Sequence, residues 1–333
     1  MGSRAAVLQS GQPGKRRMER VMLTVRQAAL DDTQAISRLF RSRITAWQRL
    51  DDRGQVQDVP YEALTIYERW LHGGPWMSIE TAALQLSHLL RGAGLPAVVE
   101  AGGQVRGYSE AYYGQEPAPF GGHLHLAHLA AEADDAGLQD ALITGCLERA
   151  AALKCARVTV SCLASDQPSR SVYERHGFEA LARVRRFNLP AKTGQVFYRA
   201  TEHLDANPEQ IRDWYMPVGR TGSARQQWET LWPRTWFAIP ELRNQRAHRL
   251  HFSVAGQEAF VYCQQQLYLP RCADVFIWSP RPLSPQTLAA VRDWAHREGY
   301  RTLTMIVPDE AAAVLGAEAE PDGFALDIYA TPV

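Results

Sequence analysis

The sequence predicts a mixed α+β protein built from two similar halves. The chain has 333 residues, about twice the ~150 residues of a typical domain, so two hydrophobic cores are expected. A strand pair, a third strand, a long helix and a buried strand are predicted between residues 96 and 165, and the same order returns between residues 248 and 308. Both halves place Gly-Phe before their last strand, at Gly177-Phe178 and Gly323-Phe324.

The composition excludes several classes of function. Apolar residues make up 46% of the chain and charged residues 22%, which is typical of a folded globular protein. The 36 basic side chains balance 36 acidic ones, so there is no strong field to attract nucleic acid or an anionic membrane. No stretch reaches the ~18 consecutive apolar residues of a membrane span. The expected ligands are therefore small.

The cysteines and the N-terminus indicate where the protein works. The five cysteines are odd in number and form no CxxC pair, which predicts a reducing, cytoplasmic compartment and no metal site: Cys146, Cys155, Cys162, Cys263 and Cys272. Residues 1–21 lack the apolar core of a signal peptide and are expected to be a flexible leader, with Met18 and Met22 as alternative starts.

The first half, residues 22–190, begins with a strand, three helical stretches and a meander of three strands. Period-2 and period-3.6 patterns place the strand at 22–28 and the helices at 30–43, 61–71 and 78–94. The meander occupies 96–104, 104–114 and 121–129, with its first turn at Gly102-Gly103.

A crossover helix and a buried strand follow the meander. The helix starts near residue 136 and carries Leu138, Leu142 and Cys146 on one stripe, and residues 156–165 form the strand. A helix that returns the chain in this way makes residues 121–129 and 156–165 a parallel pair. A short helix at 167–177 and a strand at 178–189 are expected to close this half.

The second half, residues 191–333, repeats this order with weaker local signals. Strands are expected at 248–257, 258–269, 273–280 and 301–308, a crossover helix at 284–300, and a closing strand at 322–330. The polar, proline-punctuated tract 190–220 is interpreted as the join. The tryptophan-rich stretch 228–236 is expected to pack in the core and between the halves.

The stretch "DQPSRSVYERHGF", residues 166–178, resembles a signature of the GNAT superfamily of acyl-CoA-dependent N-acyltransferases. Tyr173, Gly177 and Phe178 stand where the family has them, and Asp166 stands where the family usually has Asn. The resemblance implies two tandem GNAT-like domains. Each would be a mixed, mainly antiparallel sheet with flanking helices and a splayed central parallel strand pair, and the two halves need not be equally active.

The same resemblance implies an acyl-transfer site between the two parallel strands of the first half. Acetyl-CoA would add its pantetheine arm to the exposed strand edges, and the backbone of Leu129 would polarise the thioester carbonyl. Tyr173 corresponds to the family's general acid, with a packing tyrosine as the alternative. His123, His125 and His128 are candidates for the general base, with the outer face of a strand as the alternative for the first two.

The family's phosphate-binding loop is degenerate in this chain. Aligned on Gly137, its basic residue becomes Asp134 and its last small residue becomes Gln139. The amides of Ala136, Gly137 and Leu138 at the helix start remain available to a diphosphate, and the Gln139 side chain could crowd it or donate to it.

Plain helix capping by Asp134 and Asp135 is the alternative to any role of this loop in cofactor binding. Asp166 is a further cofactor-binding candidate through the position that it takes in the family signature. In the second half, Pro280, Pro282 and Pro285 remove amides that a phosphate cradle needs, so no CoA is expected there.

The sequence therefore predicts an N-acetyltransferase that transfers an acetyl group from acetyl-CoA to the amine of a small molecule or peptide. The first half would be active, and the second half would be a structural partner. The alternative is a non-catalytic protein of the same fold that binds a small ligand or a partner. No nucleic acid or membrane partner is expected, and a homodimer is possible.

Overall fold

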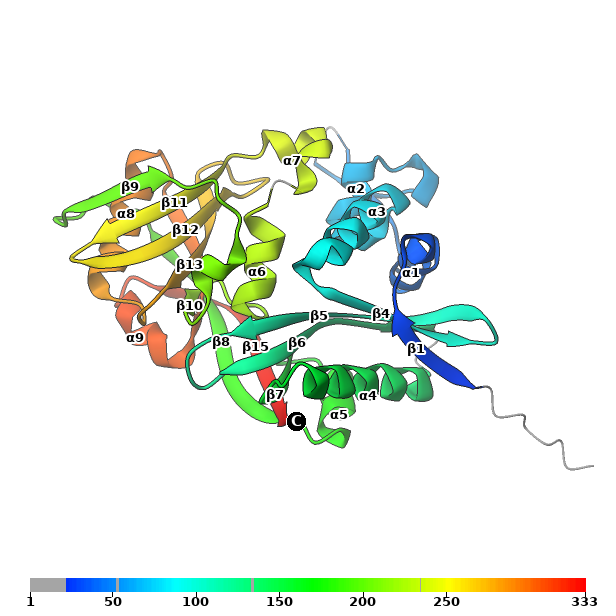
Figure 1. Ribbon diagram of the computed structural model, residues 1–333. Helices are drawn as coiled ribbons and strands as arrows, with labels where there is room; N and C mark the ends of the chain where they lie inside the picture. Colours follow the sequence, from blue (N-terminus) through cyan, green and yellow to red (C-terminus); the bar gives the residue numbers. More distant parts are fainter. Residues whose placement is uncertain (1–21, 52–53, 133–134, 234) are drawn as a thin grey trace, which may run out of the picture.

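The computed structural model describes residues 22–51, 54–132, 135–233 and 235–333, so the predicted leader and Asp134 lie outside the described residues. It confirms the α+β class. A 13-stranded mixed sheet runs through both halves, and helices cover its faces (Figure 1). No described helix is long and apolar enough to span a membrane.

The first half follows the predicted order closely. Its sheet strands are β1 (Leu23–Gln27), β4 (Leu95–Ala101), β5 (Gln104–Gln115), β6 (Gly122–Ala131), β7 (Arg157–Leu163) and β8 (Glu179–Pro190), and its α-helices are α1 (Thr33–Arg41), α2 (Ile66–Leu71), α3 (Ile79–His88), α4 (Ala136–Ala152) and α5 (Gln167–Arg175). A small hairpin that was not predicted, β2 (Gln48–Leu50) with β3 (Val56–Asp58), lies between α1 and α2. Short helical turns occur at Leu30–Asp32, Tyr61–Ala63, Gly74–Met77 and Leu89–Ala93.

The second half repeats the strand order and adds elements of its own. Its strands are β9 (Tyr198–Glu202), β10 (Tyr215–Val218), β11 (Ala247–Val254), β12 (Gln257–Gln265), β13 (Cys272–Ser279), β14 (Thr302–Pro308) and β15 (Glu320–Pro332), and its α-helices are α6 (Ala224–Leu231), α7 (Pro240–Asn244), α8 (Pro285–Arg297) and α9 (Ala312–Leu315). Short helical turns occur at Pro208–Ile211, Thr235–Ala238 and Asp309–Ala311.

The expectation that each half closes with its own strand is wrong. The sheet order is β1-β4-β5-β6-β7-β15-β8-β14-β13-β12-β11-β9, so the last strand of the chain lies between the last two strands of the first half. β15 pairs antiparallel with β7 from Leu326↔Leu163 to Pro332↔Arg157, and β8 pairs antiparallel with β14. A Gly-Phe pair directly precedes β8, and another lies within β15. The exchange of these two closing strands between the halves leaves each interior strand of the sheet paired on both edges. The sheet therefore continues across residue 190.

The tract 190–220, which was interpreted as the join of the two halves, also contributes two strands to the sheet. β9 pairs antiparallel with β11 at one end of the sheet, and β10 pairs antiparallel with β13. These strands have only five and four residues and lie among prolines, which explains why the alternation pattern does not reveal them.

Two groups of helices cover opposite faces of the first half of the sheet. α4 and α5 lie on one face, whereas α1, α2 and α3 lie on the other, with α6 of the second half beside them (Figure 1). The predicted packing role of the tryptophan-rich stretch is confirmed. Trp228 and Trp232 stack with ring centroids 4.1 Å apart and are fully buried, and Trp236 contacts Trp70 of α2 at 4.4 Å.

A buried ion pair joins the two halves at the end of β5. Arg220 donates to the carboxylate of Glu116, which also accepts the Ala224 amide at 2.9 Å, and Phe120 covers the guanidinium at 4.0 Å. Burial acts to raise the pKa of Glu116, but Arg220, His123 and the Ala224 amide together outweigh it, so the pKa lies below its ordinary value. Glu116 is therefore a carboxylate whose partner comes from the other half.

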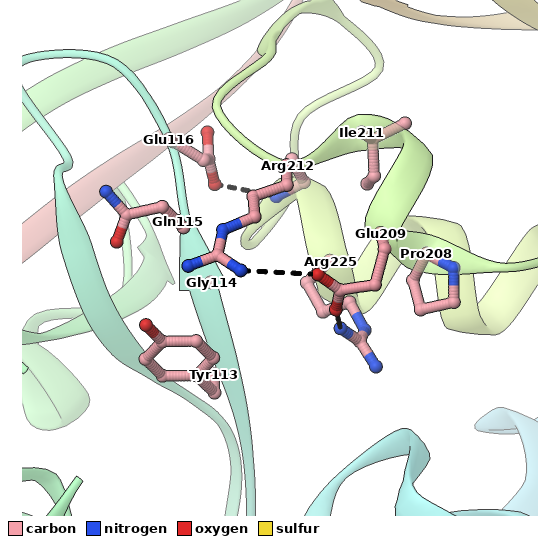
Figure 2. Close-up of a pocket in the computed structure, with 10 residues that line it drawn as sticks. Tyr113, Gly114, Gln115, Glu116, Pro208, Glu209, Ile211, Arg212 and Arg225 are labelled. Atoms are coloured by element: carbon pink, nitrogen blue, oxygen red, sulfur yellow. Dashed lines mark hydrogen bonds and ion pairs between the residues drawn. The ribbon is translucent and has the colours of Figure 1, made fainter.

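Beside this pair is a hollow of about 50 Å³, bridged at its rim by ion pairs of Glu209 with Arg212 at 3.5 Å and Arg225 at 3.6 Å (Figure 2). Such a volume holds water rather than an acyl donor.

The exchanged strand makes the first half dependent on the C-terminus. We expect the fragment 22–190 to lack a cooperative unfolding transition, because one edge of β7 and both edges of β8 are left without their partner strands. Co-expression with 191–333 should restore the transition, as measured by circular dichroism during heating. If the fragment alone melted as cooperatively as the whole chain, the exchange would not be needed for stability.

Candidate functional site

The central parallel pair of the first half opens into a gap. β6 and β7 pair in parallel only from His123↔Arg157 to Leu126↔Val160, although both strands continue beyond these residues. Beyond Leu126 and Val160, none of the described strands lies between β6 and β7. The other edge of β7 is covered by β15, and the other edge of β6 is covered by β5. This is the splayed geometry that the family resemblance implied.

A β-bulge sets which groups face the gap. The register of β5 with β6 changes between Ala111↔Leu126 and Glu110↔His128, so Ala127 is an extra residue on β6. The Gly122 carbonyl points toward β7, where it accepts the Ala156 amide at 2.8 Å. Backbone groups along a strand point alternately to its two edges, and the extra residue at the bulge shifts this alternation by one. Counted from Gly122, the N–H and C=O of Leu129 therefore point toward the gap. Consistent with this orientation, the Leu129 carbonyl accepts a hydrogen bond from Arg43 Nη1 at 3.2 Å.

Tyr173 stands at the gap from the opposite face of the sheet. It projects from α5 into the core cluster that contains Val160 and Cys162 of β7, and its ring contacts Phe178 with centroids 5.7 Å apart. Burial, with smaller contributions from Cys162 and Asp166, raises the pKa of Tyr173 to about 12, while Arg43 acts in the opposite direction. The phenol is therefore protonated at neutral pH, as a general acid must be.

The three histidines share the face of the sheet that carries α1 and α3. Paired residues on antiparallel strands share a face, and His123, His125 and His128 pair with Gly114, Tyr112 and Glu110. The bulge brings His128 onto this face in spite of its odd spacing from His125.

The alternative that His123 and His125 cover an outer face is wrong, because the second half buries them. His125 bonds Thr159 Oγ1 at 3.0 Å and lies under Gly222, and His123 lies within 3.6 Å of Glu116. Their exposures are only 2% and 0%. His128 is half-buried against the edge of Phe40, and its ring makes no hydrogen bond with the described residues.

The start of α4, where a diphosphate was expected, is capped from within the chain. Asp135 Oδ1 accepts the amides of Gly137 at 2.9 Å and Leu138 at 3.4 Å, which are two of the three amides expected to bind a phosphate. Ala136 and Gly137 are exposed, and Gln139 is half-buried one turn further on. The alternative of a plain helix cap is thus confirmed for Asp135. An anion would have to displace this carboxylate.

Asp166, the other predicted cofactor contact, caps α5. Its Oδ1 accepts the Ser169 amide at 3.1 Å, and Pro168 stands in the first turn of the helix. This cap fixes the start of the helix that carries Tyr173.

Comparisons with known sequences and structures show similarity to GNAT N-acetyltransferases. Residues 56–178 match the family model of the Acetyltransferase (GNAT) family, a range that includes β6, α4, β7 and Tyr173. Residues 56–178 are therefore similar to a GNAT-family domain. A search of curated proteins finds no match.

Several solved structures share the GNAT fold over nearly the whole chain. A GCN5-related N-acetyltransferase from Kribbella flavida is 14% identical with a TM-score of 0.54, and the match covers 94% of this chain and 71% of that one. A GCN5-related N-acetyltransferase from Anabaena variabilis is 11% identical with a TM-score of 0.56, covering 93% and 72%. A probable N-acyltransferase from Enterococcus faecalis is 10% identical with a TM-score of 0.54, covering 94% and 73%.

The corresponding gap of the second half is filled by the chain itself. β13 and β14 pair in parallel from Cys272↔Thr302 to Val275↔Met305 and then separate. β10 enters the opening, where it pairs with β13 at Val218↔Ile277, and the next residue, Gly219, donates its amide to the Ile306 carbonyl of β14 at 2.7 Å. Gly219 has φ +88°, and a Cβ there would lie 2.3 Å from Phe276, so this entry requires glycine.

Two residues near the GNAT gap were not predicted from the sequence. Arg43, just beyond α1, reaches the Leu129 carbonyl, and nothing in the helical pattern signals that contact. Glu110 is buried on β5, where it accepts hydrogen bonds from Gln85, Tyr108 and Tyr112. The alternation Tyr-Ser-Glu-Ala-Tyr is a signal that could have placed this carboxylate on a buried face.

The described residues contain no cluster of three or more metal-ligating side chains. Cys162 is 7% exposed and burial raises the pKa of its thiol, so it is a buried small side chain rather than a nucleophile. The chemistry available at this GNAT gap is therefore acid–base chemistry by Tyr173 and His128, with backbone hydrogen bonding by Leu129.

The buried histidines predict how stability depends on pH. Burial, with nearby positive charge, holds the pKa of His125 well below its ordinary value, so His125 stays neutral when folded but protonates when unfolded below pH ~6.5. Protons then bind the unfolded state preferentially, and stability falls as the pH drops from ~6.5 to ~5. His125→Gln should reduce this loss by up to roughly 1.4 kcal/mol per pH unit. Urea unfolding at several pH values would check it, and an unchanged pH slope would show that His125 protonates within the fold.

Proposed function

We propose that this protein transfers an acetyl group from acetyl-CoA to the amine of a small molecule or peptide, in its first half alone. The observation that carries the proposal is the contrast between the two gaps. The β6–β7 gap has free strand edges to which a pantetheine arm could add, whereas β10 already satisfies the edges of the β13–β14 gap.

The residues at the first gap can take complementary roles in this reaction. The Leu129 amide would donate to the carbonyl oxygen as negative charge develops on it. His128, with uncommitted ring nitrogens on the α1 and α3 face, would accept the proton of the amine as its nitrogen forms the bond to the acetyl carbon. Tyr173, protonated in the gap, would give its proton to the departing thiolate as the carbon–sulfur bond breaks. His123 and His125 are enclosed by the second half and are left out of this scheme.

One observation favours a second candidate, a non-catalytic protein that binds a small ligand without CoA. The Asp135 carboxylate occupies amides that a diphosphate would use, and its negative charge repels that group. Acetyl-CoA binding separates the two candidates.

The wider setting is proposed on separate grounds. The cysteines are all free, which supports a reducing, cytoplasmic compartment. β1 and β9 are the end strands of the described sheet, so we propose one of these edges as the contact in a homodimer. The balanced charge supports a partner that is neither nucleic acid nor a membrane surface.

Calorimetry with acetyl-CoA tests the proposal directly. We expect one site per chain, and Asp135→Asn should bind about fivefold or more tighter, because asparagine can still cap α4 but removes the charge near the phosphates. Glu148→Gln, which removes an exposed charge further along the same helix, is the matched control and should not change the affinity. Two equivalent sites would refute the division between the halves, and no binding by the parent or Asp135→Asn would favour the non-catalytic candidate.

Tyr173→Phe tests the general acid. It keeps the ring contact with Phe178 and deletes the hydroxyl, so turnover should fall by roughly 10²–10⁴-fold while acetyl-CoA affinity stays nearly constant. Tyr113→Phe on β5, at a tyrosine that is 40% exposed, is the control and should keep full activity. Unchanged turnover in Tyr173→Phe would assign this tyrosine to packing.

A further inference from the structure

A second cavity, separate from the β6–β7 gap, lies where α2 of the first half meets the second half. Its volume is about 670 Å³, within the range of small-molecule sites. The floor is the face of β11 and β12 that carries Arg249, Tyr262 and Gln264, where the small side chain of Ala247 leaves room. Trp70 of α2 and Trp236 close one side of the cavity, with their ring centroids 4.4 Å apart. Both halves are therefore needed to form the cavity.

Positive charge predominates on the cavity wall. Arg243, Arg246 and Arg249 line it together with one carboxylate, Glu202. Arg246 pairs at 2.5 Å with Glu298, which is outside the lining, and Arg249 donates to the Trp232 carbonyl at 3.0 Å. Arg243 is exposed, and its side chain makes no ion pair or hydrogen bond with the described residues. The Arg243 guanidinium is therefore suited to bind the carboxylate of a ligand, because its planar N–H donors match the two carboxylate oxygens.

Aromatic rings supply the rest of the wall. Tyr67, Trp70 and Trp236 are half-buried, and Tyr262 is 8% exposed with its pKa raised to about 12 by burial, so its hydroxyl remains a donor. Gln245 and Gln264 are held by a mutual hydrogen bond of 2.7 Å, which fixes the amide groups at the floor. Ring faces favour a flat apolar body, and the fixed amides and arginines favour a polar end.

We propose that this cavity binds a small aromatic carboxylate, with its ring between the aromatic side chains and its carboxylate on Arg243. This binding site is independent of the acyl-transfer proposal. It also gives the second half a role of its own, since the gap of that half is filled by β10 and its sheet face forms the cavity floor.

Calorimetry of the full chain with three probes tests the chemistry of the site. We expect 2-naphthoate to bind at one site. 2-Naphthamide, which keeps the ring without the charge, and cyclohexanecarboxylate, which keeps the charge without the aromatic ring, should each bind at least about tenfold more weakly. Equal binding of 2-naphthamide and 2-naphthoate, or no binding of 2-naphthoate, would overturn the proposal.

Variants locate the bound probe. Arg243→Gln should weaken 2-naphthoate binding about tenfold, and Arg243→Lys, which keeps the charge without the planar donors, should have an affinity between those of the parent and Arg243→Gln. Arg281→Gln, on the exposed loop before α8, is the matched control. Saturating acetyl-CoA should leave the affinity for 2-naphthoate unchanged. Equal affinities in Arg243→Gln and Arg281→Gln would refute the site, and competition with acetyl-CoA would place the probe in the β6–β7 gap instead. Thermal melting of each variant would confirm that it is folded.

Discussion

The backbone hydrogen bonds of β15 are the constraint on which the rest of the structure depends. This last strand of the chain fills the place between β7 and β8, so the first half has no complete sheet until the second half has been folded against it. β8 in turn reaches β14, which makes the exchange reciprocal. The position of β7, and therefore the width of the gap beside β6, is set by a strand more than 150 residues away in the sequence.

Each half contains a central parallel strand pair, β6–β7 in the first half and β13–β14 in the second, but the two pairs are used differently. In the first half, a bulge at Ala127 turns the Leu129 amide toward an open gap and moves His128 onto the helical face. In the second half, β10 and Gly219 satisfy both diverging strands. Unpaired strand edges attract an extended partner, so the first gap is available to a ligand, whereas the second gap has become part of the core. A repeated fold thus carries one candidate acyl-transfer site.

Burial between the halves also decides which titratable groups can take part in chemistry. His123 and His125 lie under the Arg220–Gly222 segment, and Glu116 is held as a carboxylate by Arg220. His128 lies outside this contact, and Tyr173 reaches the gap from the other face. The same histidine-rich strand therefore supplies both the interface of the halves and a candidate base, and the position of each residue relative to the Arg220–Gly222 segment separates the two roles.

The sequence by itself determined the order of the main strands and helices, the parallel pair and the position of Tyr173, because periodicity and turn residues are local properties. For the same reason, the sequence predicted helix capping by Asp135 as an alternative. Only the tertiary structure decided that β15 crosses to the other half, that β10 fills one gap, that Arg43 reaches Leu129, and that two of the three histidines on β6 are enclosed. These outcomes depend on which surfaces meet, and strand alternation is the same whether a polar face meets solvent or another half of the chain.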